Sequence, residues 1–90
     1  MAKGNAVSIS NERFAENLRV IMARRRSSAA DVCRATGIRQ ATFSEHMSGK
    51  HEFPIVEIEA IIVRYLGWDL DNPETWARLL RPADDTELAS

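Results

Sequence analysis

Cys33, His46 and His51 are the side chains of this sequence best suited to metal binding and to nucleophilic or acid–base chemistry. A single cysteine cannot form a disulfide within one chain, and the two histidines have no cysteine or carboxylate at the spacing of a zinc site. A catalytic base also needs a nucleophile or a pocket beside it, and the sequence identifies neither. We therefore expect no metal, no cofactor and no enzymatic activity, with Cys33 as a small buried apolar residue.

Residues 39–51 contain a second set of candidate side chains, which are polar or small except for Phe43 and Met47. These two lie four residues apart and predict the buried edge of a short helix that begins at Gln40 and ends at Met47. The other positions predict an exposed polar face on that helix. This face is the candidate binding surface, and the elements around it must hold it in place.

The charges of the chain are distributed unevenly, although the net charge is only −1. Residues 12–51 hold eight basic and four acidic side chains, whereas residues 52–90 hold three basic and nine acidic ones. The first of these regions is therefore the candidate surface for an anionic partner. For the triplet Arg24-Arg25-Arg26, an equally good interpretation is a solvated helix end that the negative pole of the helix dipole favours.

Length and composition predict one small domain. The 90 residues, of which 44% are apolar and 28% charged, suit a single globular core. All apolar runs are shorter than the roughly 18–20 residues that span a bilayer, and the first residues lack the apolar stretch of a signal peptide, so we expect a cytoplasmic protein. The predicted organisation is a flexible N-terminal arm over residues 1–9, a helical domain over residues 10–82 and an acidic tail over residues 83–90.

Apolar periodicity and capping residues predict an all-α fold, a compact bundle of five helices. Ser28 and Asp31 have the spacing of a capping box at the start of the second helix, and Gly37 suits its left-handed end. Pro54 and Pro73 suit the first turns of the fourth and fifth helices. The five helices run from Ser10 or Asn11 to about Arg25, over residues 28–36, from Gln40 to Met47, from Ile55 to Leu66, and from Pro73 to a stop at Pro82.

The second and third predicted helices, joined by a tight turn at Gly37, have the arrangement of a helix-turn-helix motif. Residues 13–72 resemble the family of phage Cro and lambda-type repressors, also called the xenobiotic-response-element family. The resemblance implies a lambda-repressor-like fold and a transcriptional regulator that binds double-stranded DNA, whereas composition and periodicity alone predict only a helical bundle. The matching positions are Leu18, Ser28, Val32, Gly37-Ile38, Thr42-Phe43, Ser48-Gly49-Lys50, Pro54, Leu66-Gly67 and Leu70-Asp71.

The resemblance also implies roles for individual side chains. Gln40 takes the place where the recognition helix of the family enters the major groove, and a glutamine there can pair with N7 and N6 of adenine. Arg39 suits guanine or a phosphate, Ala41 suits the methyl group of thymine, and Glu45, beside Ser44, suits the amino group of cytosine. The alternative is a solvated helix surface. The implied phosphate contacts are Ser28, which its capping role also explains, and Thr42, Lys50 and His51.

A homodimer is a further implication, because two recognition helices about 34 Å apart fit a palindromic operator. We place Trp68, Leu70, Trp76 and Leu79 at its interface, although the two tryptophans suit the core of a single chain equally well. The implied activity is repression from an operator that overlaps a promoter, with activation left open. The alternative is an antitoxin or phage adaptor that acts mainly through a protein partner, which the acidic second half of the chain favours.

Overall fold

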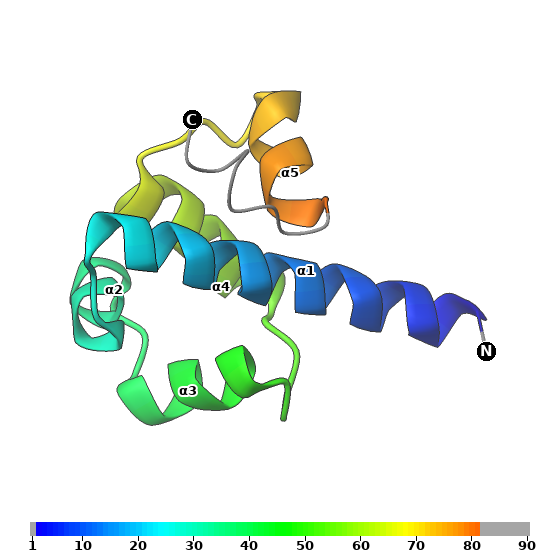
Figure 1. Cartoon of the computed structure of the whole chain (residues 1–90), viewed down its shortest axis with the longest axis horizontal. Coiled ribbons are helices and arrows are strands. Elements are labelled where there is room, and N and C mark those ends of the chain that lie inside the picture. Colours follow the sequence, from blue (N-terminus) through cyan, green and yellow to red (C-terminus); the bar gives the residue numbers. More distant parts are fainter. Residues whose placement is uncertain (1, 82–90) are drawn as a thin grey trace.

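Helix α1 (Ala2–Arg25) is the longest element and crosses the whole molecule (Figure 1). The computed structural model describes the backbone of residues 2–81 and the side chains of residues 11–81, and this part of the chain contains helices and no strand. The all-α fold expected from the sequence is confirmed. Figure 1 shows α3 on one side of α1 and α5 on the other. The elements after α1 are α2 (Ala29–Thr36), α3 (Gln40–Ser48), α4 (Ile55–Ala60), the π-helical segment η1 (Ile61–Leu66) and α5 (Pro73–Leu80).

The core is built on an apolar stripe of α1, in which Phe14, Leu18 and Ile21 recur at i, i+4 and i+7. All three side chains are less than a tenth exposed. They belong to one cluster with buried side chains of α2, α3, η1 and α5 and with Phe53 from the loop before α4. A single core therefore supports every element near the candidate surface. The other members of the cluster are Ala15, Val32, Cys33, Phe43, Ile61, Ile62, Leu66 and Leu79.

The helix ends agree with the predicted capping signals. The Ser28 Oγ accepts a hydrogen bond from the backbone N–H of Asp31 at 3.2 Å, and the Asp31 carboxylate accepts one from the backbone N–H of Ser28 at 2.8 Å, so the capping box is formed. Gly37 and Gly49 follow α2 and α3 with φ of 83° and 88°, a left-handed conformation that glycine adopts without steric cost. Asn72 caps α5 through its side chain. These local signals fix the bounds of α2, α3 and α5.

The start of α1 differs from the prediction. Ser10 or Asn11 is the expected cap, after a flexible arm over residues 1–9, but the helix begins at Ala2. Asn11 is not a cap, because its side-chain oxygen accepts a hydrogen bond from the backbone N–H of Phe53, 2.8 Å away. The stretch before it contains no proline, the residue that most strongly interrupts a helix.

The segment predicted as one helix over residues 55–66 changes its hydrogen-bond pattern halfway. Helix α4 ends at Ala60, and η1 continues as a π-helical segment to Leu66. Ile61 and Ile62 are neighbours in the sequence, yet both are fully buried. The wider π turn lets these two side chains face the core together, which a repeating pattern of 3.6 residues does not predict.

The described residues also bear on membrane spanning, metal binding and the predicted C-terminal tail. No helix among residues 2–81 is long and apolar enough to cross a membrane. The side chains described in the structure include no group of three or more histidine, cysteine, aspartate or glutamate residues that fits a metal ion. Pro82 and the predicted acidic tail, residues 83–90, lie outside the described residues.

Asn17 connects α1 to the end of α5. Its side chain is fully buried, and Nδ2 donates to the carbonyl oxygens of Leu79 and Arg81, each at 2.8 Å. Carbonyls at the C-terminus of a helix have no partner within that helix, so one amide group satisfies two of them. No local signal marks Asn17 in the sequence, because its partner in α5 is 62 residues away.

Truncation of the Asn17 side chain to a methyl group, Asn17→Ala, should lower the free energy of unfolding by about 1–3 kcal/mol. The carbonyl groups of Leu79 and Arg81 would lose their hydrogen-bond donor. Urea unfolding followed by circular dichroism measures the change. Glu16→Ala is the matched control, since Glu16 is the exposed neighbour on the same helix. Equal, small changes in the two variants would show that the Asn17 hydrogen bonds do not stabilise the fold.

Candidate nucleic-acid interface

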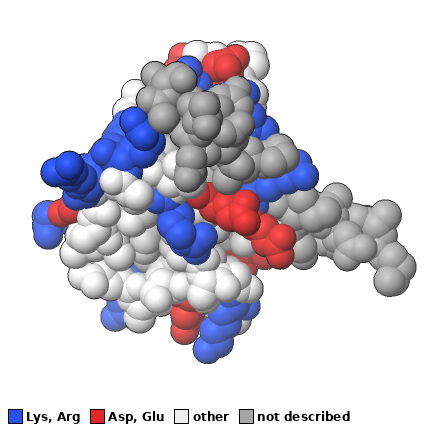
Figure 2. Space-filling view, viewed as in Figure 1, with Lys and Arg blue, Asp and Glu red and all other residues white. Residues whose placement is uncertain are grey.

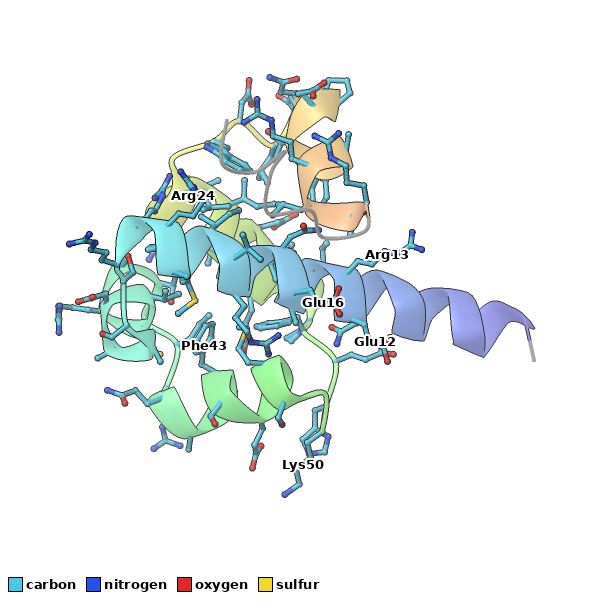
Figure 3. The ribbon with its side chains drawn as sticks, viewed as in Figure 1. Glu12, Arg13, Glu16, Arg24, Phe43 and Lys50 are labelled. Carbon is cyan, nitrogen blue, oxygen red and sulfur yellow. The ribbon has the colours of Figure 1, made fainter. Side chains whose placement is uncertain are left out.

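Helix α3 divides its side chains between the core and the solvent. Phe43 and His46 are buried, with 1% and 8% of their surface exposed, whereas Gln40, Ala41 and Ser44 are exposed. Figure 3 shows Phe43 between α3 and α1. The polar face predicted for this helix is therefore present, on a helix that the core holds from the other side.

Arg39 and Thr42 lie beside the start of α3. Arg39 precedes the helix in an extended conformation, with φ of −69° and ψ of 142°, and its side chain is exposed. Both residues line a shallow groove of about 350 Å³, whose other side includes Val56 and Ala60 of α4. Thr42 is half-buried there, so it is less accessible to a phosphate than the sequence predicts.

Glu45 and Lys50 form an ion pair at the end of α3, with 3.9 Å between Oε2 and Nζ. The backbone N–H of Lys50 also donates to the carbonyl oxygen of Glu45 at 3.0 Å, which fixes the start of the following loop. The Lys50 side chain is exposed and projects away from the helices (Figure 3), and His51 beside it is exposed as well. An anion that approaches Lys50 therefore competes with the Glu45 carboxylate.

Ser28 acts as the cap of α2, and a carboxylate occupies the same helix end. The hydrogen bond from the backbone N–H of Ser28, followed by contacts with the Ser28 hydroxyl group and with Arg34, holds the pKa of Asp31 below its ordinary value. The Ser28 backbone N–H is thus already used, although the Ser28 side chain remains exposed. A phosphate at this end of α2 would lie close to a negative charge.

A short capped helix, a glycine turn and a second helix with an exposed polar face have the geometry of a helix-turn-helix unit. The family model of the Cro/C1-type HTH DNA-binding domain matches residues 17–69. The chain belongs to the Cro/C1-type helix-turn-helix family. Searches of curated proteins and of solved structures gave no match. The Cro/C1-type domain is a DNA-binding domain of transcription regulators.

This Cro/C1-type domain contains a partly buried hydrogen bond that the sequence does not predict. Nδ1 of His46 lies 2.7 Å from Oε1 of Glu57 on α4, and the His46 ring packs edge-on against Phe53, with 5.2 Å between ring centroids. The carboxylate is eleven residues away on another helix, so local spacing does not reveal it. Cys33 is buried as expected, and its burial, together with the charge of Glu57, raises the pKa of its thiol.

The side chains predicted for a dimer interface lie in or against the core of the domain. Leu79 is fully buried where α5 packs on α1, so in the single chain it belongs to the core. Trp68, Leu70 and Trp76 are half-buried and pack against the same core. Nε1 of Trp76 donates to the carbonyl oxygen of Leu70 at 2.8 Å. These contacts agree with the alternative that both tryptophans complete the core of one chain.

The basic side chains of the domain are not concentrated on α3. Figure 2 shows Lys and Arg side chains spread over the visible face, with acidic side chains between them. Arg25, from the arginine triplet, donates to the carbonyl oxygens of Tyr65 at 3.0 Å and Leu66 at 3.3 Å. Arg25 is also the last residue of α1, so its positive charge lies at the C-terminus of α1, as one interpretation predicts, and at that of η1 as well.

Asp31 should make the stability of the domain depend on pH in the acid range. Because its pKa in the folded state lies below the ordinary value of 3.8, the carboxylate stabilises the fold above that pH, and this contribution is lost as the pH falls through the folded-state pKa. We expect Asp31→Asn to lower the melting temperature near neutral pH, and the difference from the wild type to shrink at acid pH. Calorimetry between about pH 7 and about pH 2 measures this linkage.

The control for the acid titration is Glu16→Gln, which removes an exposed carboxylate from α1. It should have little effect on the melting temperature at either end of the pH range. A deficit in Asp31→Asn that stays constant down to the lowest pH would contradict the assignment.

Proposed function

We propose that this chain is a homodimeric repressor that acts in the cytoplasm and binds a palindromic operator in double-stranded DNA. The observation that supports the proposal best is the division of α3 between a core side, with Phe43 and His46, and an exposed side, with Gln40 and Ser44. A helix held in this way can enter the major groove as one rigid element. Repression then requires only that the operator overlap a promoter.

Base reading is proposed for the exposed side of α3 and for Arg39 before it. Gln40 is the first residue of α3 and exposed, so its amide group can pair with N7 and N6 of adenine. Arg39 suits O6 and N7 of guanine, Ala41 suits the methyl group of thymine, and Ser44 follows Gln40 by about one turn on the same side. Glu45 can accept from cytosine through Oε1, while Oε2 lies 3.9 Å from Nζ of Lys50.

Phosphate binding is proposed for the two ends of the helix-turn-helix unit. Lys50 and His51 are exposed in the loop after α3, and Ser28 is exposed at the start of α2. These contacts position the domain without reading sequence. Thr42 is the weakest member of the set, because it is half-buried in the groove beside α4.

Truncation of the main base-reading side chain, Gln40→Ala, should weaken binding to the preferred duplex roughly 10- to 100-fold, the range expected for loss of one bidentate base contact. The preferred duplex is obtained by selection from a random-sequence library with the wild-type protein. Fluorescence anisotropy then measures the affinity of each variant for the selected duplex and for a random duplex. Binding to the random duplex should be unchanged.

Lys50→Ala is the matched control for the same assay. It removes a proposed phosphate contact, so it should weaken binding to both duplexes alike. The number of ions released on binding, measured from the salt dependence of the affinity, should fall by about one. A wild-type protein that binds selected and random duplexes equally would overturn the operator proposal. The antitoxin or phage adaptor function would then be the better explanation.

For the homodimer, we propose that the second chain docks on the outer side of α4 and η1. Ile55, Val56 and Val63 in this segment are 58%, 69% and 49% exposed, the largest exposures among the large apolar side chains that the structure describes. Glu59 and Arg64, which are exposed in the same segment, carry opposite charges. A two-fold axis brings the same surface of both chains together, so the acidic group of each can approach the basic group of the other.

A charge placed on this surface, Val63→Glu, should convert the dimer into a monomer, because two carboxylates would have to be buried at the interface. Size-exclusion chromatography with light scattering measures the molar mass without DNA. The control is Leu80→Glu, which changes a partly exposed apolar side chain of α5. Dissociation in the control variant, with an intact dimer in Val63→Glu, would place the interface on α5 instead.

A further inference from the structure

We propose that His46 and Glu57 are positioning residues, whose hydrogen bond sets the orientation of α3 and thereby contributes to base discrimination. The inference rests on the proposed function of α3 as the helix that reads DNA. It goes beyond that function, because neither side chain belongs to the exposed face that would touch the bases.

The hydrogen bond joins the recognition helix to α4 from the inside. The 2.7 Å contact links Nδ1 of His46 to Oε1 of Glu57, and the two side chains are only 10% and 18% exposed. The ring of His46 is also confined by Phe53, so the donor or acceptor atom of the imidazole has a fixed direction. A hydrogen bond has a narrow range of lengths and angles, unlike an apolar contact, and it therefore restricts how α3 can rotate on α4.

The rest of the contact between α3 and α4 is open on the side of the reading residues. The groove of about 350 Å³ separates the start of α3, at Thr42, from Val56, Glu57 and Ala60 of α4. Helix α4 therefore supports α3 near His46 and leaves its first turn without close packing from that direction. In the contact between α3 and α4, the tilt of the first turn is therefore restrained by this bond, in addition to the packing of α3 on α1 and α2.

A small rotation of α3 about His46 produces a large displacement of Gln40. The two residues are six positions apart, which is roughly 9 Å along an α-helix. A rotation of about 10° at one end displaces the other by about 1.5 Å, more than the roughly 0.5 Å within which a binding group must be placed. Loss of the bond is therefore expected to reduce discrimination between base pairs even when the helix remains folded.

The test replaces the polar pair by an apolar pair, with His46→Leu and Glu57→Leu in one protein. An apolar pair of similar volume often maintains stability or improves it, so unfolding measurements should show a folded domain. The ratio of affinities for the selected and random duplexes should fall about tenfold, comparable with the cost of one mismatched base pair. Affinity for the random duplex should be unchanged, because phosphate contacts do not depend on this bond.

His46→Asn is the conservative variant for the same measurement. Its side-chain amide lies near the position of Nδ1 and can keep the hydrogen bond to Glu57, so the affinity ratio should return to within about threefold of the wild-type value. A purely structural role predicts a different order, in which the apolar double variant retains the ratio because it retains the fold.

Each outcome decides the proposal. A folded double variant with an unchanged affinity ratio overturns it. If the double variant does not fold, Glu57→Leu replaces it, because leucine can neither donate nor accept a hydrogen bond, and an unchanged ratio in that variant overturns the proposal as well. Failure of the proposed function is seen separately, in a wild-type protein that has no preference between the duplexes.

Discussion

Phe53, in the loop between α3 and α4, supplies the contact on which the arrangement of the domain depends. Its ring packs edge-on against Phe14 of α1, Phe43 of α3 and His46 of α3, with centroid distances of 5.1, 6.0 and 5.2 Å. Its backbone N–H is held by the side chain of Asn11. One loop residue therefore fixes both the distance between α1 and α3 and the side of α3 that remains in solvent. Edge-to-face packing of this kind restricts orientation more than aliphatic contacts do.

The sequence predicts those features whose causes lie within a few residues of one another. The capping box at Ser28 and the left-handed glycine after α2 depend on neighbouring positions, and the exposed face of α3 follows from the spacing of its apolar residues. The roles of Asn17 and His46 depend on partners 62 and 11 residues away, so no local pattern contains them. Apolar periodicity identifies Leu79 as buried, but it does not say whether a second chain or the same chain buries it.

The proposed DNA-binding surface carries little net charge, and this has consequences for how affinity arises. Residues 39–50 contain two basic side chains, Arg39 and Lys50. The carboxylate of Glu45 lies 3.9 Å from Nζ of Lys50. Counterion release from phosphates supplies most of the salt-dependent affinity of DNA-binding proteins, so one domain of this kind gains little from it. Binding in the proposed mode then depends on base contacts and on two domains that act together.

Side chains of α1 satisfy the ends of helices that come much later in the chain. Asn17 donates to the carbonyl groups of Leu79 and Arg81 at the end of α5. Arg25 donates to the last two carbonyl groups of η1, which are 40 and 41 residues further along the chain. During synthesis, α1 leaves the ribosome before η1 and α5, so these side chains have no partners until the later helices emerge. The core therefore closes only when residues up to about Leu79 have emerged, so folding is coupled to completion of nearly the whole domain rather than proceeding helix by helix.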